Sequence, residues 1–395
     1  MVKLIGFELK KMFSHRYLIP VWLLLFGLSF ITNFIMYGYN EQYVKSEREF
    51  YSKYGGVLTE QKHMAIAKMA DNWEPFNNNE GEFRKEWIIA DDAMHDISYM
   101  ISYRDLRERI INQAQENAEL YGEKGYVYLD RLNRQILKKY KSYTQPMLIS
   151  SSDFRWFLGD NMYVAFAMLM IMILTANIFT REWESKMNSV LCSSYAGKSK
   201  VFLSKIGASA AGSFGVMLAF IFVKHLVGMY TLCLYGWRAP IGSIERFAYT
   251  TLDMDIWQAD SLFILLTCTA AMLFGILFSA LSSFCKRSFV STVISFLILT
   301  AGYLGFFVLR YFNNMLYHID FESERIKRFL DMLRSFVFTL LLEPQEYFYN
   351  YYTVSIFGYP VPTVISSLVI GGMSVGLVTV IAYALYIGGI IRKKG

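Results

Sequence analysis

The sequence predicts an all-α membrane protein with six transmembrane helices. Of its 395 residues, 54% are hydrophobic and 17% are aromatic, and the mean hydropathy of +0.29 is too high for a soluble protein of this length. Six apolar runs are each long enough to cross a bilayer as a helix. A polar stretch over residues 38–158, called the insertion below, separates the first run from the others.

Residues 1–37 are predicted to hold an amphipathic elbow helix and the first span. Five apolar side chains share one helical face within residues 2–14: Val2, Ile5, Leu9, Met12 and Phe13. Such a helix can lie in the headgroup layer, although the same residues could be only a basic flank that sets the topology. The run Leu18–Tyr37 is longer than a signal-peptide core and lacks a cleavage site, so we expect it to remain as an anchor.

The insertion, residues 38–158, is predicted to form a soluble and mainly helical domain. It is polar, charged and rich in tyrosine, and no run within it could span a membrane. Helical periodicity is visible in its apolar residues Ile97, Ile101, Leu106 and Ile110. About 120 residues are enough for a small hydrophobic core.

Residues 159–395 are predicted to contribute the remaining spans and one shorter helix. The spans are Met162–Phe179, Leu203–Val223, Ser261–Phe284, Phe289–Leu309 and Thr363–Ile391. The segment Phe329–Leu342 is also apolar, but it is short and carries Asp331 and Arg334, which are costly at the centre of a bilayer. We therefore expect a re-entrant or interfacial helix there rather than a seventh span.

The distribution of Lys and Arg predicts how the spans are oriented. Basic residues outnumber acidic ones in the short loops on the side of the N-terminus, whereas the rest of the chain is net acidic. Short cytoplasmic loops are typically the basic ones. We therefore expect a multi-pass plasma-membrane protein with both termini in the cytoplasm and the insertion outside the cell. This bias accounts for the formal charge of +6, and no nucleic-acid partner is expected.

The connector between the second and third spans is long, amphipathic and basic. Written as a helix over residues 181–199, it places four apolar side chains on one stripe: Trp183, Met187, Val190 and Leu191. Glu182 and Lys186 stand four residues apart on another face, in the favourable order for an ion pair. Such a helix can lie along the membrane surface or dock into a partner's groove, and the residues alone leave both interpretations open.

The sequence lacks a recognisable catalytic, cofactor or metal site. Gly197-Lys-Ser199 resembles the end of a phosphate-binding loop, but Cys192 stands where that loop needs its first glycine. The 5 His and 4 Cys residues form neither an HExxH nor a CxxC motif. We therefore expect a protein that is not an enzyme and has no ATP site of its own.

Small residues recur at a spacing of four inside two predicted spans. Ala211 with Gly215, and Gly372 with Gly376, permit close approach between helices. The contact could lie within one bundle or between two copies of the chain, and the sequence does not separate these cases.

Lys224 and His225 lie near the end of the third span, where they indicate either a proton relay or a lysine that snorkels. Lys205 enters the other end of that span, about 28 Å away along a helix. We therefore expect Lys224 at the far membrane interface, with its ammonium group among the headgroups.

The assembled pattern resembles the membrane subunit of a type-2 ABC exporter. Members of that family have an elbow helix, six spans, a coupling helix between spans two and three, and short re-entrant helices before the last span. The most specific match is Arg181-Glu-x-Glu184 followed by Leu191, and the basic turn at Gly197 and Lys205 also fits. The family often has Gly-Thr after the second glutamate, where this chain has Ser185-Lys-Met187. The insertion resembles those of some Gram-positive permeases that handle antimicrobial peptides.

The resemblance implies a permease that works with a separate ATPase subunit. Two copies would form the path along which an amphipathic or hydrophobic substrate, such as a peptide or lipid-like molecule, moves outward. The ATPase would dock on the connector through Arg181, Glu182, Trp183, Glu184, Met187, Val190 and Leu191. Trp183 is expected to anchor the apolar contact, with the charged residues paired at its rim. Rival interpretations are a secondary transporter and a membrane-anchored ligand sensor or immunity protein.

Overall fold

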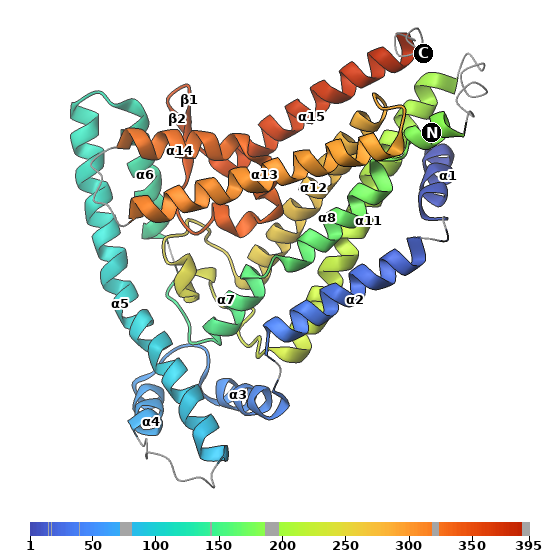
Figure 1. Ribbon diagram of the computed structural model, residues 1–395. Coiled ribbons are helices and arrows are strands. Elements are labelled where there is room, and N and C mark those ends of the chain that lie inside the picture. Colours follow the sequence, from blue (N-terminus) through green and yellow to red (C-terminus); the bar gives the residue numbers. More distant parts are fainter. Residues whose placement is uncertain are drawn as a thin grey trace.

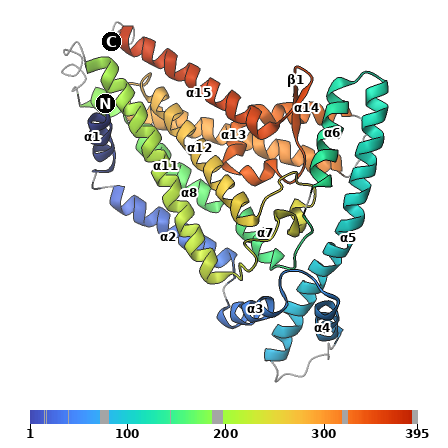
Figure 2. The same ribbon diagram turned by 180° about the vertical axis from the view of Figure 1, so that it is seen from behind.

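The structure, a computed structural model, describes residues 1–14, 16, 18–38, 40–71, 81–142, 144–185, 197–317 and 324–388. These residues form an α-helical fold with a short β-hairpin (Figures 1 and 2). Among them, 6 helical stretches are long and apolar enough to cross a membrane, which confirms the prediction of an all-α chain with six candidate spans. They are α2 (Leu18–Met36), Ser151–Glu184, α11 (Gly197–Thr231), α12 (Ile256–Ser282), α13 (Ser288–Tyr317) and α15 (Thr363–Gly388).

The second candidate span is built from three helices, although the sequence predicts one helix over Met162–Phe179. Its parts are α7 (Ser151–Gly159), α8 (Met162–Thr175) and α9 (Thr180–Glu184). The break after α8 leaves the carbonyl oxygen of Ala176 without a helical partner, and the Ser291 hydroxyl of α13 donates a hydrogen bond to it. A side chain from a distant span thus stabilises a turn that apolar periodicity alone does not reveal.

α8 lies at the centre of the bundle, and three of the other spans lie at its edge. The buried share is 67% for Ser151–Glu184, compared with 22% for α2, 18% for α13 and 28% for α15. α8 is apolar on all sides, as expected for a helix that other helices surround, and it packs against α2, α11 and α12. The edge helices present most of their apolar side chains outward, which suits contact with lipid.

The bundle has two distinct ends (Figure 1). One end, called the α1 end, carries α1 (Val2–Phe13), α9 and the last turn of α15. The other, called the insertion end, carries the helices of the insertion. These are α3 (Glu41–Tyr54), α4 (Glu60–Asp71), α5 (Gly81–Glu123) and α6 (Val127–Lys141).

The insertion is fastened to the end of α11 through α3. The Arg48 guanidinium donates hydrogen bonds to the carbonyl oxygens of Met229 and Leu232, at 2.7 and 3.0 Å. Gly55, which follows α3, lies so close to Tyr235 that a Cβ atom there would be 2.4 Å from the ring. α7, at the end of the predicted insertion, also packs with the short helices η1 (Ile241–Ser243) and η2 (Glu245–Phe247) and with α12.

Buried carboxylates lie where the insertion meets α7. Glu47 accepts a hydrogen bond from the Ser150 hydroxyl at 2.8 Å, and Asp96 accepts one from Ser151. Burial, together with the neighbouring carboxylate of Asp153, raises the pKa of Glu47 from 4.5 to about 8. The folded chain binds this proton more tightly than the unfolded chain. The contribution of this proton to the free energy of unfolding is therefore complete below pH about 4.5. It decreases as the pH rises from there and is lost once the pH has passed about 8.

The predicted helix Phe329–Leu342 is two elements in the structure. α14 (Glu324–Phe336) ends one residue before the 3-10 helix η3 (Phe338–Leu342). Arg334 is buried, with its guanidinium 3.5 Å from the centre of the Tyr352 ring. Its charge, which makes a membrane span unfavourable here, is therefore packed on an aromatic face. The 3-10 helix η4 (Pro344–Tyr347) and the antiparallel strands β1 (Thr353–Ile356) and β2 (Tyr359–Pro362) then lead into α15.

α11 and α12 approach each other closely at Gly275. A Cβ atom there would lie 1.9 Å from the Ser213 hydroxyl oxygen and 3.1 Å from the Ser209 carbonyl oxygen. We expect Gly275→Ala to lower the free energy of unfolding by about 1–3 kcal/mol, because Ser213, whose own Cβ atom would lie 2.8 Å away, must move to make room. Thermal unfolding in detergent micelles measures this loss.

Gly372→Ala is the matched control, because nothing lies within 4 Å of a Cβ atom at Gly372. This change should leave stability equal or raise it by about 0.5–1 kcal/mol, since alanine favours a helix over glycine. Equal melting temperatures for Gly275→Ala and the original protein would contradict the observed packing of α11 on α12.

Candidate functional site

A buried ionic cluster at the α1 end joins α1, α9 and α11. The Oε1 atom of Glu182 accepts a hydrogen bond from Lys11 Nζ at 2.8 Å and lies 2.6 Å from Lys205 Nζ. Lys205 also donates to the carbonyl oxygen of Ile178 at 2.8 Å, and its ammonium group lies 5.0 Å from the centre of the Phe179 ring. The exposed fraction is 0% for Lys205 and 4% for Glu182.

The charges in this cluster depend on one another for stability. Glu8 of α1 is also buried, so two carboxylates and two ammonium groups lie together: Glu8, Lys11, Glu182 and Lys205. Taking a charge out of water costs several kcal/mol, and only a well-placed opposite charge offsets that cost. The cluster therefore holds α9 firmly against α1 and α11.

Glu184 fastens the same short helix to α13. Its Oε1 atom accepts a hydrogen bond from the Ser288 backbone N–H at 2.7 Å, and its Oε2 atom accepts one from the Ser288 hydroxyl at 2.8 Å. Ser288 is the first residue of α13, where backbone N–H groups have no helical partner and a carboxylate is favourable. α9 therefore contacts α13 as well as the ionic cluster.

The structure corrects part of the predicted docking surface. Glu182 is not a rim residue, because its side chain turns into the bundle toward Lys11 and Lys205. Arg181 and Trp183 are half-buried, and Glu184 is exposed although it caps α13.

The rest of that surface lies outside the described residues. The predicted helix 181–199 is helical at its start in α9 and again from Gly197, where α11 begins. Residues 186–196 are not described, and they include the remaining apolar residues of the predicted stripe: Met187, Val190 and Leu191. The stripe as a whole stays a prediction.

α1 packs along α11 through part of its predicted apolar face. The Ile5 side chain would be 3.1 Å from a Cβ atom at Gly207, and Leu9 and Met12 lie within 3.5 Å of one at Gly212. Glycines at these positions of α11 thus let α1 approach closely. Val2, on the same predicted face, is 82% exposed.

The predicted small-residue pairs do not pack within the described chain. Ala211, Gly215 and Gly376 are exposed and Gly372 is half-buried. Nothing lies within 4 Å of a Cβ atom at any of the three glycines. Of the two open interpretations, packing inside the bundle is therefore wrong for these pairs. They lie on outward faces of α11 and α15, which can contact lipid or a second copy of the chain.

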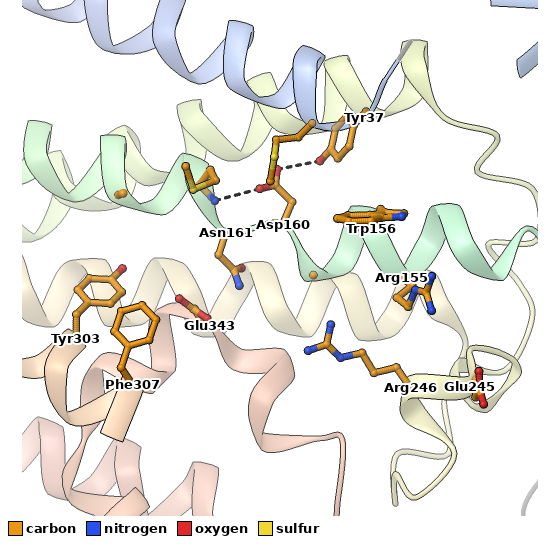
Figure 3. A pocket seen from close by; sticks show the side chains of 14 residues that line it. Tyr37, Arg155, Trp156, Asp160, Asn161, Glu245, Arg246, Tyr303, Phe307 and Glu343 are labelled. Atoms are coloured by element: carbon orange, nitrogen blue, oxygen red, sulfur yellow. Dashed lines mark hydrogen bonds between the residues drawn. The ribbon is translucent and has the colours of Figure 1, made fainter. Parts of the chain in front are cut away.

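A pocket of about 910 Å³ lies toward the insertion end, between α2, α8 and α13. Figure 3 shows Tyr303 and Phe307 on one side of this space and Arg155 and Trp156 on the other, with Arg246 extending between them. The remaining lining residues are Met36, Tyr37, Gly159, Asp160, Asn161, Met162, Ala165, Glu245 and Glu343.

The pocket combines an apolar wall with charged groups of both signs. Asp160 accepts a hydrogen bond from the Tyr37 hydroxyl at 3.0 Å, which joins the end of α2 to the start of α8. The Arg246 guanidinium stacks 4.2 Å from the centre of the Tyr349 ring and lies 3.6 Å from Glu346. An apolar cavity with a few fixed polar groups is the usual form of a binding site for a small or amphipathic molecule.

The lysine that the sequence predicts to snorkel, Lys224, is buried near α7 and the start of α8. Lys224 is 4% exposed, and its ammonium group lies 4.6 Å from the centre of the Phe157 ring and 5.1 Å from that of Tyr163. The expectation that Lys224 reaches the headgroups is therefore wrong, because α7 covers this end of α11. Cation–π contact takes the place of water around the ammonium group.

His225, beside Lys224, forms a hydrogen-bonded pair with Asp260 of α12. Its Nδ1 atom lies 2.9 Å from the carbonyl oxygen of Ile221, which can only accept, so Nδ1 carries a hydrogen. Its Nε2 atom lies 2.9 Å from an Asp260 carboxylate oxygen. This contact joins α11 to α12 within the bundle.

Comparison with known proteins finds no matching family model, no similar curated protein and no similar solved structure. The functional argument therefore rests on the residues of this chain. The likeness to type-2 ABC permeases stays a hypothesis.

We expect Glu182→Ala to lower the free energy of unfolding by about 3–5 kcal/mol, because it leaves Lys205 charged and buried without its partner. Glu184→Ala, two residues away, removes only a helix cap and should cost about 0.5–2 kcal/mol. Replacing Glu182 and Lys205 together by methionine should recover most of the loss, since no unpaired charge remains. Thermal unfolding of the purified variants in detergent micelles compares the three. Similar losses for Glu182→Ala and Glu184→Ala would refute the role given to the cluster.

Proposed function

We propose that the chain is the membrane-spanning permease subunit of an ABC exporter and that a separate ATPase subunit powers it. One observation carries the proposal: the connector between the second and third spans begins in a helix that is tied to several others. Glu182 joins α9 to α1 and α11, and Glu184 joins it to α13. A force applied to the connector would therefore reach three helices of the bundle at once.

The proposed orientation places the α1 end in the cytoplasm and the insertion outside. The basic short loops support this arrangement, and so does the position of α1 beside α11, where an elbow helix would lie along the inner membrane surface. An ATPase in the cytoplasm could then reach Arg181 and Trp183, which remain half-exposed on α9. Glu182 acts inside the permease in this proposal, rather than on the docking surface.

The proposed substrate is amphipathic or hydrophobic and binds in the pocket between α2, α8 and α13. Trp156, Tyr303 and Phe307 supply aromatic contacts for an apolar part. Arg155 and Asp160 in its lining supply charge for a polar part. α2 and α13 are edge helices of the bundle, so a substrate could enter the pocket from the lipid.

A second copy of the permease is part of the proposal. The pairs Ala211 with Gly215 and Gly372 with Gly376, of which only Gly372 is half-buried and the others are exposed, permit close helix approach from outside the bundle. These faces on α11 and α15 are candidates for contact between two copies.

A secondary transporter is the second candidate, and the partly buried His225–Asp260 pair favours it. Ionisable groups buried within membrane helices mark proton pathways, and this pair lies between α11 and α12 at 2.9 Å. In that case a proton gradient would drive transport without any ATPase.

We expect Trp183→Ala to leave the bundle folded while weakening ATPase binding, because truncating an aromatic anchor costs about 2 kcal/mol or more. That cost corresponds to roughly 30-fold in affinity. The measurement is ATP-driven export of a fluorescent amphipathic peptide by vesicles containing the permease with its co-expressed ATPase. Trp257→Ala is the matched control, since Trp257 is 48% exposed at the insertion end and should leave ATP-driven export unchanged.

Two results would contradict the proposal. If Trp183→Ala and Trp257→Ala exported equally well, the connector would not be the docking site. If vesicles without the ATPase exported the peptide on a proton gradient, and His225→Phe abolished that export, the secondary transporter would be the correct function.

A further inference from the structure

The hairpin before α15 ends in a turn that places an aromatic side chain in an unfavourable backbone conformation. Strands β1 and β2 pair in the register Thr353↔Pro362 to Ile356↔Tyr359, which leaves Phe357 and Gly358 as the two turn residues. Their φ angles are 49° and 77°. A two-residue turn with positive φ at both positions favours Asn-Gly or Asp-Gly, since a side chain with a bulky Cβ substituent is strained there.

The described chain leaves the aromatic ring at this turn uncovered. The Phe357 side chain is 98% exposed, so almost none of its ring contacts the described chain. The neighbouring turn residues are apolar as well, with Ile356 41% and Tyr359 58% exposed. A strained backbone that carries an uncovered aromatic ring is a reason to look for a function of that ring outside the fold.

The tip of the hairpin also has a fixed basic group beside it. The Arg131 guanidinium of α6 lies 3.9 Å from the centre of the Tyr359 ring, and its Nη1 atom donates a hydrogen bond to the Gly358 carbonyl oxygen at 3.2 Å. Aromatic rings next to an arginine are typical of protein segments at the boundary between headgroups and acyl chains.

The position of the hairpin agrees with such a boundary. β2 ends at Pro362, and the apolar helix α15 begins at Thr363. Other exposed aromatic residues mark the same end of the spans, among them Trp156 of α7, Tyr230 of α11 and Trp257 of α12. Figures 1 and 2 both show the hairpin on the opposite side of the molecule from α3 and α4, pointing away from them.

We propose that the tip of this hairpin inserts into the lipid bilayer beside α15, with Phe357 among the upper acyl chains and Tyr359 with Arg131 at the headgroups. The hairpin also contacts α6: the Tyr128 hydroxyl lies 2.9 Å from that of Thr353, and Tyr351 donates to Gln135 at 2.6 Å. The inserted tip thereby seats α6 of the insertion on the membrane surface. This inference requires only that α15 spans a membrane, and it does not depend on ATP-driven export.

Photo-crosslinking tests the lipid contact directly. Phe357 is replaced by p-benzoylphenylalanine, a close analogue, and the purified chain is irradiated in vesicles of phosphatidylcholine and phosphatidylglycerol. We expect lipid adducts by mass spectrometry at a yield similar to that of the same replacement at Val369 on the outward face of α15, which is 53% exposed. The yield should be several-fold above that at Val57, which is 66% exposed in the insertion.

Two outcomes would overturn the proposal. Adduct yields at Phe357 as low as those at Val57 would place the tip in water. A crosslinked dimer of the chain in place of lipid adducts would make the tip a contact between two copies.

A second measurement separates insertion from folding. Phe357→Asn suits the turn, because asparagine tolerates positive φ better than phenylalanine, so the hairpin should stay folded while losing its hold on lipid. We expect amide hydrogen exchange in α6 to be slower in vesicles than in detergent for the original chain and for Phe357→Trp. The difference should vanish for Phe357→Asn. Equal vesicle protection of α6 in Phe357→Asn and the original chain would contradict the seating of α6 by the tip.

Discussion

The buried contact between Glu182 and Lys205 is the constraint on which the α1 end of the molecule depends. Both groups are almost completely removed from solvent, and their side-chain atoms lie 2.6 Å apart. Neither charge is stable there without the other. Because Lys11 joins from α1 and Glu184 caps α13, the short helix α9 has little freedom to move by itself. Any partner that shifts the connector must also shift the spans.

The helix α11 connects this cluster to the pocket region at the other end. Lys205 and Lys224 lie on the same continuous helix, about 28 Å apart, and both are buried. Near Lys224, the rings of Phe157 and Tyr163 lead to α7 and α8, which line the pocket. In the proposed permease, this continuous helix would transmit a force on the connector toward the pocket.

The sequence predicts the helices well and their polar contacts poorly. An apolar run of about 20 residues has few structures open to it in a bilayer, so the six candidate spans follow from composition. The sequence places Glu182 on an exposed face because helical periodicity reports only on neighbouring residues, whereas its partners Lys11 and Lys205 are distant in the chain. A lysine at the start of an apolar run was the available signal, since a buried charge needs a partner.

The sequence also does not predict where helices pack closely, which residues line the pocket or what the hairpin tip does. The pairs with Gly215 and Gly376 have the spacing of close-packing helices, yet α11 and α12 approach each other closely at Gly275, which meets Ser213. The pocket brings together side chains from several separate segments, so no single pattern indicates it. The tip at Phe357 was missed because Phe-Gly is not a usual turn signal.

The measurement that most directly tests the account is the sidedness of the two ends of the bundle. A cysteine at Ser14, which is exposed beside α1, and one at Ser52, which is exposed on α3, report the two ends. Cys192 is replaced by serine, and the described native cysteines Cys233, Cys268 and Cys285 are buried. A membrane-impermeant maleimide should label Ser52→Cys in intact cells and Ser14→Cys only after lysis. Labelling of Ser14→Cys in intact cells, or of Ser52→Cys only after lysis, would contradict a connector that faces a cytoplasmic ATPase.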